Sequence, residues 1–321
     1  MLKLFPFPSV REDPSDTVPG RRRGARIAAG AATHMLALAG CSAGAISSPQ
    51  PSMLMADPGF PPFGHIHGFG INDRTGTSYV ASHDGLYELP AIGSPTVATS
   101  KLPGPIDRTK DDLMGFVQRG DLQFASGHPA TMTGDLGLIE RVGASGKWRT
   151  VALADTTDFH ALDVVVNPDD TFTALGYDAA TSTVNVSHDS GRTWTAGDVI
   201  ELRDLTADAT LPGVLYATTA NGLMVSKTYG AHWKLVAGAP SLYLVESLNS
   251  TAGGDLIGVD VHQQLWAKSA ATKWRKTGVL RGQADALTYS SSSGGILLTD
   301  DDRGIIVSRD LGTSWKVLVK R

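Results

Sequence analysis

Tryptophan recurs along the chain at an almost constant interval. Five of the six tryptophans stand at positions 148, 194, 233, 274 and 315, at intervals of 46, 39, 41 and 41 residues. Each follows a turn-like segment and precedes a short run of β-forming residues. A unit of about forty residues with four short strands is typical of one blade of a β-propeller. We therefore expect an all-β propeller with blades that begin near residues 65, 112, 159, 202, 242 and 283.

The segment before the tryptophan carries a recurring polar frame. Ser187–Trp194 reads Ser-His-Asp-Ser-Gly-Arg-Thr-Trp, and Ser308–Trp315 keeps Ser, Asp, Gly and Trp at the same places. Aspartate can cap the backbone donors of a tight turn, and glycine accepts a positive φ there. Tryptophan can fill the gap between neighbouring sheets. The frame is similar to the Asp-box, or BNR repeat, which implies a structural role at the rim of each blade.

The number of blades follows from residues 64–321, which hold six units. A seventh blade would need strands from residues 42–63, where Ser, Pro, Ala and Gly predominate. Such a composition is typical of a flexible tether. Six blades are the prediction, and seven are the alternative.

The N-terminal forty residues have the order of features of an export signal. Arg21–Arg23 and Arg26 precede a short apolar run that ends at Cys41, the single cysteine of the chain. A charged start, an apolar middle and a small-residue end are typical of a signal peptide. Leu38–Cys41 resembles a bacterial lipobox, which implies a lipid on Cys41 and a location on the extracytoplasmic side of the cell membrane. The predicted parts are a signal peptide (1–40), the lipidated cysteine with its tether (41–63) and the propeller domain (64–321).

The charge balance limits the partners of the processed chain. Loss of residues 1–40 removes six basic and three acidic residues, which leaves 22 Lys and Arg against 29 Asp and Glu. The net charge of −7 does not provide the basic surface that nucleic-acid binding needs. It also gives no attraction to anionic lipid, so we expect membrane attachment through the lipid anchor alone.

Histidines and aspartates gather where the first three blades would meet on one face. The positions at the starts of the inner strands are His65, His67, Asp112, Met114, His160 and Asp163. Those in the loops between the second and third strands are His83, His128, Tyr177 and Asp178. Because residues i and i+2 of a strand point to the same side, His65 and His67 are expected to face one ion together.

Three interpretations of this cluster remain open. Imidazoles beside carboxylates suit a transition metal, and we predict copper or zinc at His65, His67, Met114 and His160, where the methionine sulfur favours copper. The loop residues His83, His128, Tyr177 and Asp178 are predicted to bind a ligand. The alternatives are a polar plug in the central channel and an organic ligand or substrate.

The chain from residue 65 to 321 also resembles bacterial BNR-repeat lipoproteins that are labelled glycosyl hydrolases or exo-sialidases. The resemblance is carried by the repeat frames and by the blocks His65–Gly68, Met114–Phe116, Ser126–Pro129, Leu136–Ile139 and Phe159–Asp163. It implies hydrolysis of extracellular glycans, for which Asp112 and Asp163 would be the carboxylates. The Arg-Ile-Pro motif of sialidases does not occur in the sequence. We therefore predict a surface module that binds a ligand, a metal or a protein partner, with glycoside hydrolysis as the alternative.

Overall fold

The computed structural model describes residues 62–321 except residues 132, 209, 249–252 and 292–294. The chain divides into two units, residues 1–52 and 53–321, and every described residue belongs to the second. The predicted signal peptide, Cys41 and nearly all of the predicted tether lie outside the described residues. Among the residues that are described, no helix has the length and apolar character needed to cross a membrane.

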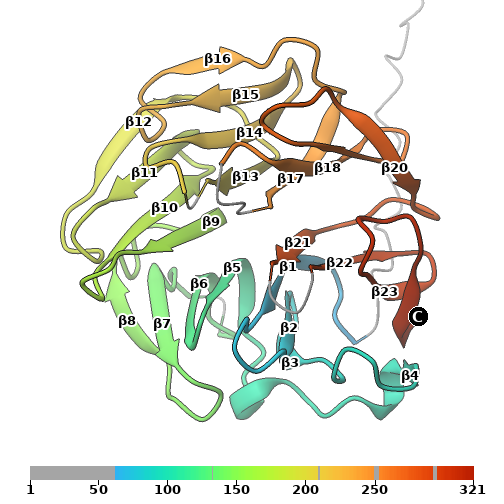
Figure 1. Ribbon diagram of the computed structural model, residues 1–321. Helices are drawn as coiled ribbons and strands as arrows, with labels where there is room; N and C mark the ends of the chain where they lie inside the picture. Colours follow the sequence, from blue (N-terminus) through green and yellow to red (C-terminus); the bar gives the residue numbers. More distant parts are fainter. Residues whose placement is uncertain (1–61, 132, 209, 249–252, 292–294) are drawn as a thin grey trace, which may run out of the picture. The chain divides into compact units, whose positions relative to one another are not determined.

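The second unit is a ring of six antiparallel sheets (Figure 1). Blade 1 consists of β1 (Ile66–Ile71), β2 (Ser78–Ser82) and β3 (Gly85–Glu88). Blade 2 consists of β5 (Asp112–Arg119), β6 (Leu122–His128), β7 (Leu138–Val142) and β8 (Arg149–Ala152). Blade 3 consists of β9 (Phe159–Val166), β10 (Phe172–Asp178), β11 (Thr183–Ser187) and β12 (Thr195–Val199).

The second half of the ring repeats the same up-and-down order. Blade 4 consists of β13 (Asp204–Ala207), β14 (Leu215–Thr219), β15 (Gly222–Ser226) and β16 (Trp233–Leu235). Blade 5 consists of β17 (Leu242–Ser247), β18 (Leu256–Asp260), β19 (Gln264–Lys268) and β20 (Arg275–Val279). Blade 6 consists of β21 (Leu287–Ser290), β22 (Ile296–Asp301), β23 (Gly304–Ser308) and β24 (Lys316–Lys320). The predicted six-bladed, all-β propeller is confirmed.

The ring is closed by an exchange between the first and last blades. The short strand β4 (Val97–Ala98) leaves blade 1 and pairs in parallel with β24, with Val97 opposite Val319. Two single-turn helices, η1 (Thr99–Lys101) and η2 (Ile106–Arg108), then lead to blade 2. The expectation of four strands in every blade is therefore wrong for blade 1, because this segment covers the outer edge of blade 6 instead.

The periodic tryptophans fill the gaps between the sheets. The apolar cluster between each two consecutive blades from 1 to 6 contains one of them. They are Trp148 (blades 1 and 2), Trp194 (2 and 3), Trp233 (3 and 4), Trp274 (4 and 5) and Trp315 (5 and 6). Between blades 6 and 1 the corresponding places are taken by Ile92, Val97 and Leu102 of the crossing segment. The tryptophan repeat therefore counts the gaps between consecutive blades, and the closing gap has its own apolar residues.

The polar frame forms an aspartate-capped turn before Trp194 and before Trp315. Asp189 Oδ1 accepts from the backbone N–H of Thr193 at 2.8 Å, and Asp189 Oδ2 accepts from the Thr193 hydroxyl at 2.7 Å. These bonds lower the pKa of the Asp189 carboxyl to about 2. Gly191 has φ of +83°, and its carbonyl accepts from Trp194 Nε1 at 3.0 Å. The turn thus orients the tryptophan that enters the gap.

Candidate functional site

The inner strands of blades 3 to 6 are joined by acidic side chains. An inner strand is an edge strand, so its outward backbone donors need partners. Asp163 Oδ2 accepts from Ala207 N at 2.7 Å, and Asp204 Oδ2 accepts from Val245 N at 2.8 Å. Glu246 accepts a backbone hydrogen bond from Tyr289, and Asp285 Oδ2 lies 3.5 Å from Ile66 N. Each carboxyl group therefore links its blade to the next one round the ring.

The inner strands of blades 1 to 3 approach one another through glycines instead. A Cβ atom on Gly70 would lie 2.6 Å from Phe116 Cε1 and 2.7 Å from Gln118 Cβ. A Cβ atom on Gly115 would lie 2.6 Å from the carbonyl oxygen of Phe159. Glycine at these positions lets β1, β5 and β9 pack closely, which brings the starts of the three strands together.

A β-bulge stands at the start of each of these three strands. The pairing of β1 with β2 passes from Ile66 to Gly68 and skips His67. The pairing of β5 with β6 skips Leu113 and Met114, and that of β9 with β10 skips His160. A bulged residue leaves the strict alternation of the strand, so its side chain is redirected. His67, Met114 and His160 are thus placed by irregularities that a period of two does not predict.

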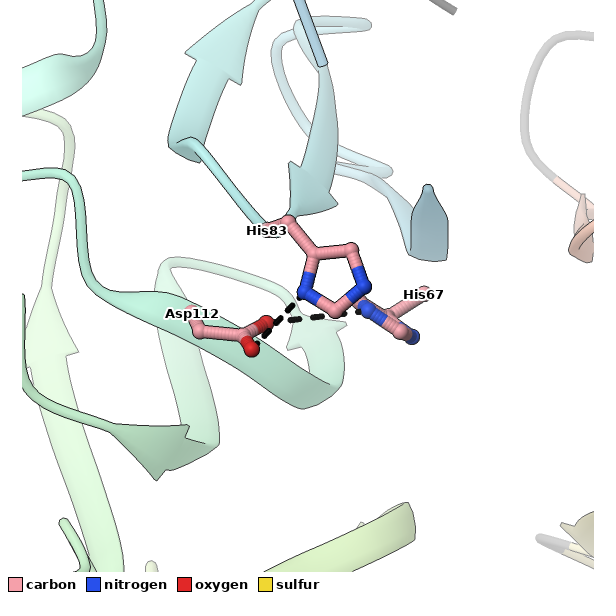
Figure 2. A group of neighbouring side chains, drawn as sticks. All are labelled: His67, His83 and Asp112. Carbon is pink, nitrogen blue, oxygen red and sulfur yellow. Dashed lines mark ion pairs between the residues drawn. The ribbon is translucent and has the colours of Figure 1, made fainter. Parts of the chain in front are cut away.

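His67, His83 and Asp112 form a compact cluster between blades 1 and 2 (Figure 2). His83 Nδ1 lies 2.7 Å from Asp112 Oδ2, and His67 Nε2 lies 3.6 Å from Asp112 Oδ1. One ligand atom from each residue lies within 4.8 Å of the others. The His83 ring packs edge-to-face with two other imidazoles. Its centroid lies 4.5 Å from that of His67 and 5.4 Å from that of His65. We call His67, His83 and Asp112 the blade 1–2 cluster.

Two atoms of the blade 1–2 cluster are buried without a hydrogen bond. Among the described residues, neither His67 Nε2 nor Asp112 Oδ1 has a hydrogen-bond partner. Burial, together with the neighbouring His83 and His65, lowers the pKa of His67 to about 3. The ring is therefore neutral at pH 7, and a neutral imidazole is the form that binds a metal. An unpaired buried polar pair costs stability unless something satisfies it.

A second series of imidazoles and carboxylates crosses blades 2 and 3. His128 Nδ1 lies 3.1 Å from Asp135 Oδ1, and His128 Nε2 lies 3.3 Å from Asp158 Oδ2. The same oxygen of Asp158 lies 2.8 Å from His160 Nε2. The hydrogen bond to Asp158 raises the pKa of His160 against the opposing effect of burial. His128 and His160 are thus linked through a carboxylate that was not among the predicted site residues.

Two adjoining cavities open at this face. The upper cavity, of about 400 Å³, is lined by His65, Ile66, His67, Met114, His160, Ala161, Tyr177, Ala179, Leu202, Arg203 and Asp285. The axial cavity, of about 290 Å³, continues along the inner strands and includes Arg119, Asp163, Asp204 and Glu246. His67, His160, Ala161, Arg203 and Asp285 line both. The predicted metal residues His65, His67, Met114 and His160 therefore share one cavity wall with Tyr177.

Two other predicted site residues lie in structural positions. Asp163 Oδ1 accepts from Val164 N at 2.7 Å and from the guanidinium of Arg119, while Oδ2 accepts from Ala207 N. Asp178 Oδ1 caps the following loop by accepting from Ala180 N at 2.8 Å. The catalytic role of Asp163 and the ligand-binding role of Asp178 stay predictions.

Three residues of this face were not among the predicted site residues. Asp158 joins His128 to His160, and Arg203 and Asp285 line the junction of the two cavities. Each stands one or two residues before an inner strand. This position in the sequence was the feature that could have indicated them. The bulges that redirect His67, Met114 and His160 could not be predicted from the types of the residues.

Comparisons with known proteins place the likeness at the level of the fold. The chain matches no protein-family model and no curated protein sequence. Among solved structures, it is similar to a chain of the nidogen/laminin complex, with a TM-score of 0.52 and 17% identity over 73% of this chain and 89% of that one. It is also similar to YCF48 bound to D1 peptide, with a TM-score of 0.47 and 12% identity over 80% and 82%.

A third similar structure is much longer than this chain. An ancestral GH74 enzyme gives a TM-score of 0.46 and 15% identity over 78% of this chain. This chain spans only 37% of that structure. At such low identities these similarities concern the fold of the chain, which is that of a β-propeller.

Proposed function

We propose that this chain is an exported, lipid-anchored β-propeller that binds a transition-metal ion, zinc or copper, at the blade 1–2 cluster. The observation that carries the proposal is the pair His67 Nε2 and Asp112 Oδ1, which are buried 3.6 Å apart without hydrogen bonds in the described part of the chain. Ligand atoms of a tetrahedral zinc ion lie about 3.3 Å from one another, given bonds of about 2.0–2.1 Å. A small rotation of the two side chains would satisfy both atoms through one ion.

His83 supports the same site in a second way. Its Nδ1 lies at hydrogen-bond distance from Asp112 Oδ2, so the ring fixes the orientation of the carboxylate. His65, whose ring lies 5.4 Å from that of His83, stands next to the cluster as a further nitrogen donor. The predicted set of His65, His67, Met114 and His160 shares only His67 with the blade 1–2 cluster, so variants can separate the two sites.

Replacing His67 with glutamine is expected to weaken zinc binding by at least about tenfold, because one of the two atoms that carry the proposal, His67 Nε2, is lost. Asp112→Asn should have a similar effect. The measurement is calorimetric titration of zinc and of copper into the chelator-treated full-length chain. His232→Gln removes an exposed histidine of blade 4 and should leave the affinity unchanged. Equal binding by wild type and His67→Gln would overturn the proposal, and loss in Met114→Ala and His160→Gln alone would move the ion into the upper cavity.

The lipid anchor has its own test. Arg21–Arg23, the apolar run and Leu38–Cys41 support export and lipid transfer to Cys41. Cys41→Ser is expected to shift the chain from the membrane fraction to the soluble fraction, because no other residue of the tether offers a thiol. The measurement is fractionation with labelling by a radioactive fatty acid, and unchanged label in Cys41→Ser would contradict the anchor.

Glycoside hydrolysis has less support as the function. A glycosidase needs two carboxyl groups that both reach the scissile bond. Asp112 lies against two imidazoles, and both oxygens of Asp163 already accept hydrogen bonds from the protein. Metal binding needs only a small rotation of His67 and Asp112 from the arrangement that they have in the blade 1–2 cluster. A propeller face of this kind also leaves room for a protein or glycan partner on the extracytoplasmic side.

A further inference from the structure

The junction of the upper and axial cavities carries an arginine, Arg203, that forms no ion pair with the described residues. Arg203 Nη2 donates to the backbone carbonyl of Asp285 at 3.2 Å, which is the one hydrogen bond of its guanidinium among the described residues. No carboxylate of those residues forms an ion pair with it. Arg203 nevertheless lines both cavities, and its backbone N–H is held by Thr218 O at 2.8 Å. The guanidinium is thus positioned over a cavity with most of its donors unused.

Arg203 is the arginine that lines the upper cavity, whereas the acidic residues Asp163, Asp204 and Glu246 line the axial cavity. His160 lines both cavities with Arg203, and its Nε2 lies 2.8 Å from Asp158 Oδ2. Asp285 is the acidic side chain that lines the upper cavity, and its Oδ2 faces Ile66 N. A planar guanidinium matches a carboxylate in two parallel hydrogen bonds.

The rest of the upper cavity suits an organic molecule. Ile66, Met114, Tyr177 and Leu202 provide apolar surface beside the charged junction. A volume of about 400 Å³ is in the range of small-molecule pockets. Apolar walls with a few fixed polar groups are the usual composition of such sites. Inorganic phosphate would leave this apolar wall uncovered.

We propose that the upper cavity binds a small organic carboxylate, with the carboxylate on Arg203 and the carbon chain against Met114, Tyr177 and Leu202. This site adjoins the metal site, because His67 lines the same cavity, but its anchor, Arg203, belongs to blade 4 and is not one of the proposed metal ligands. Asp285 at the same junction gives a place for an ammonium group, so an α-amino acid is one source of the carboxylate. A simple fatty acid of the same skeleton is the other source.

The test is calorimetric titration of 4-methylpentanoate, leucine and inorganic phosphate into the chelator-treated full-length chain. We expect 4-methylpentanoate or leucine to bind at least about tenfold more tightly than phosphate, because their carbon chains cover the apolar wall. A tenfold difference corresponds to about 1.4 kcal/mol. Tighter binding of leucine would assign the ammonium to Asp285, and tighter binding of 4-methylpentanoate would assign a simple carboxylate. Arg203→Gln should weaken binding of the preferred ligand by about tenfold or more, as loss of a charged hydrogen-bond donor does.

Arg281→Gln is the matched control for Arg203→Gln. Arg281 is exposed on the connection between blades 5 and 6 and lines neither the upper nor the axial cavity. An equal loss in both variants would show a general charge effect and overturn the proposal, as would the absence of binding by either organic probe. Zinc titration of Arg203→Gln separates this proposal from the metal site, because this variant keeps the proposed metal ligands and should not show the tenfold loss of zinc affinity expected of His67→Gln. Binding of carboxylate only to the zinc-loaded chain, and equally in Arg203→Gln, would also overturn it.

Discussion

Asp163→Ala is expected to lower the free energy of unfolding by roughly 3–5 kcal/mol, the usual cost of removing one partner from a buried ion pair. Asp163 is 4% exposed and accepts from Arg119, Val164 N and Ala207 N. Alanine would leave the guanidinium without its carboxylate and the N–H of Ala207 without an acceptor. It would also remove the link between the inner strands of blades 3 and 4. The measurement is equilibrium unfolding in guanidinium chloride.

Asp198→Ala is the control for this variant. Asp198 lies in β12 with its side chain 56% exposed, where its nearest charged partner is His232. Its replacement should change the stability by no more than about 0.5 kcal/mol, as is usual for surface positions. Unchanged stability of Asp163→Ala, together with loss of a glycan-cleaving activity, would instead favour the catalytic role predicted for Asp163. The experiment therefore separates a link in the ring from a carboxylate of a glycosidase.

The second large effect concerns the dependence of stability on pH. Asp300 lies in β22, where its Oδ1 accepts from Asp285 N at 2.9 Å and from Ala286 N at 3.3 Å. Burial, with a smaller contribution from the charge of Asp285, raises the pKa of Asp300 to about 8. Burial also raises the pKa of Asp204 to about 6. The folded chain thus binds these protons more tightly than the unfolded chain does.

The direction of the pH effect follows from these raised pKa values. The contribution of Asp300 to stability is fully present below the unfolded pKa of 3.8 and decreases as the pH rises to about 8. Each unit of difference corresponds to about 1.4 kcal/mol. We therefore expect Asp300→Asn to be more stable than wild type by a few kcal/mol at pH 9 and equal to it near pH 4. Asparagine keeps an oxygen for the two backbone donors and carries no charge.

Asp302→Asn provides the comparison for Asp300→Asn. Asp302 is exposed two residues further along, so its replacement should leave the pH profile of unfolding as it is in wild type. Thermal unfolding from pH 4 to pH 9 measures both variants. A gain in Asp300→Asn that is the same at every pH would contradict the buried, proton-binding carboxyl group.

Part of the candidate site could be predicted from the sequence because it depends on strand order. The inner strands and the loops between second and third strands share one face in a propeller, which placed His65, His67, Met114, His160 and Tyr177 near one another. The partners within the site could not be predicted in the same way. The pairing of His83 with Asp112, and of Asp158 with His160, depends on bulges and on glycines that let neighbouring blades approach.

The sequence by itself determined the blade count, the capped turns and the gaps that the tryptophans fill. The tryptophans repeat about every forty residues, and each of these features rests on contacts within one blade or between consecutive blades. Only the tertiary structure decided that β4 would leave blade 1 for blade 6, that Asp163 would join two inner strands, and that Arg203 would reach the backbone of Asp285 at the junction of two cavities. Those outcomes depend on how the ring closes, because closure brings together residues that lie far apart in the chain and carry no common local pattern.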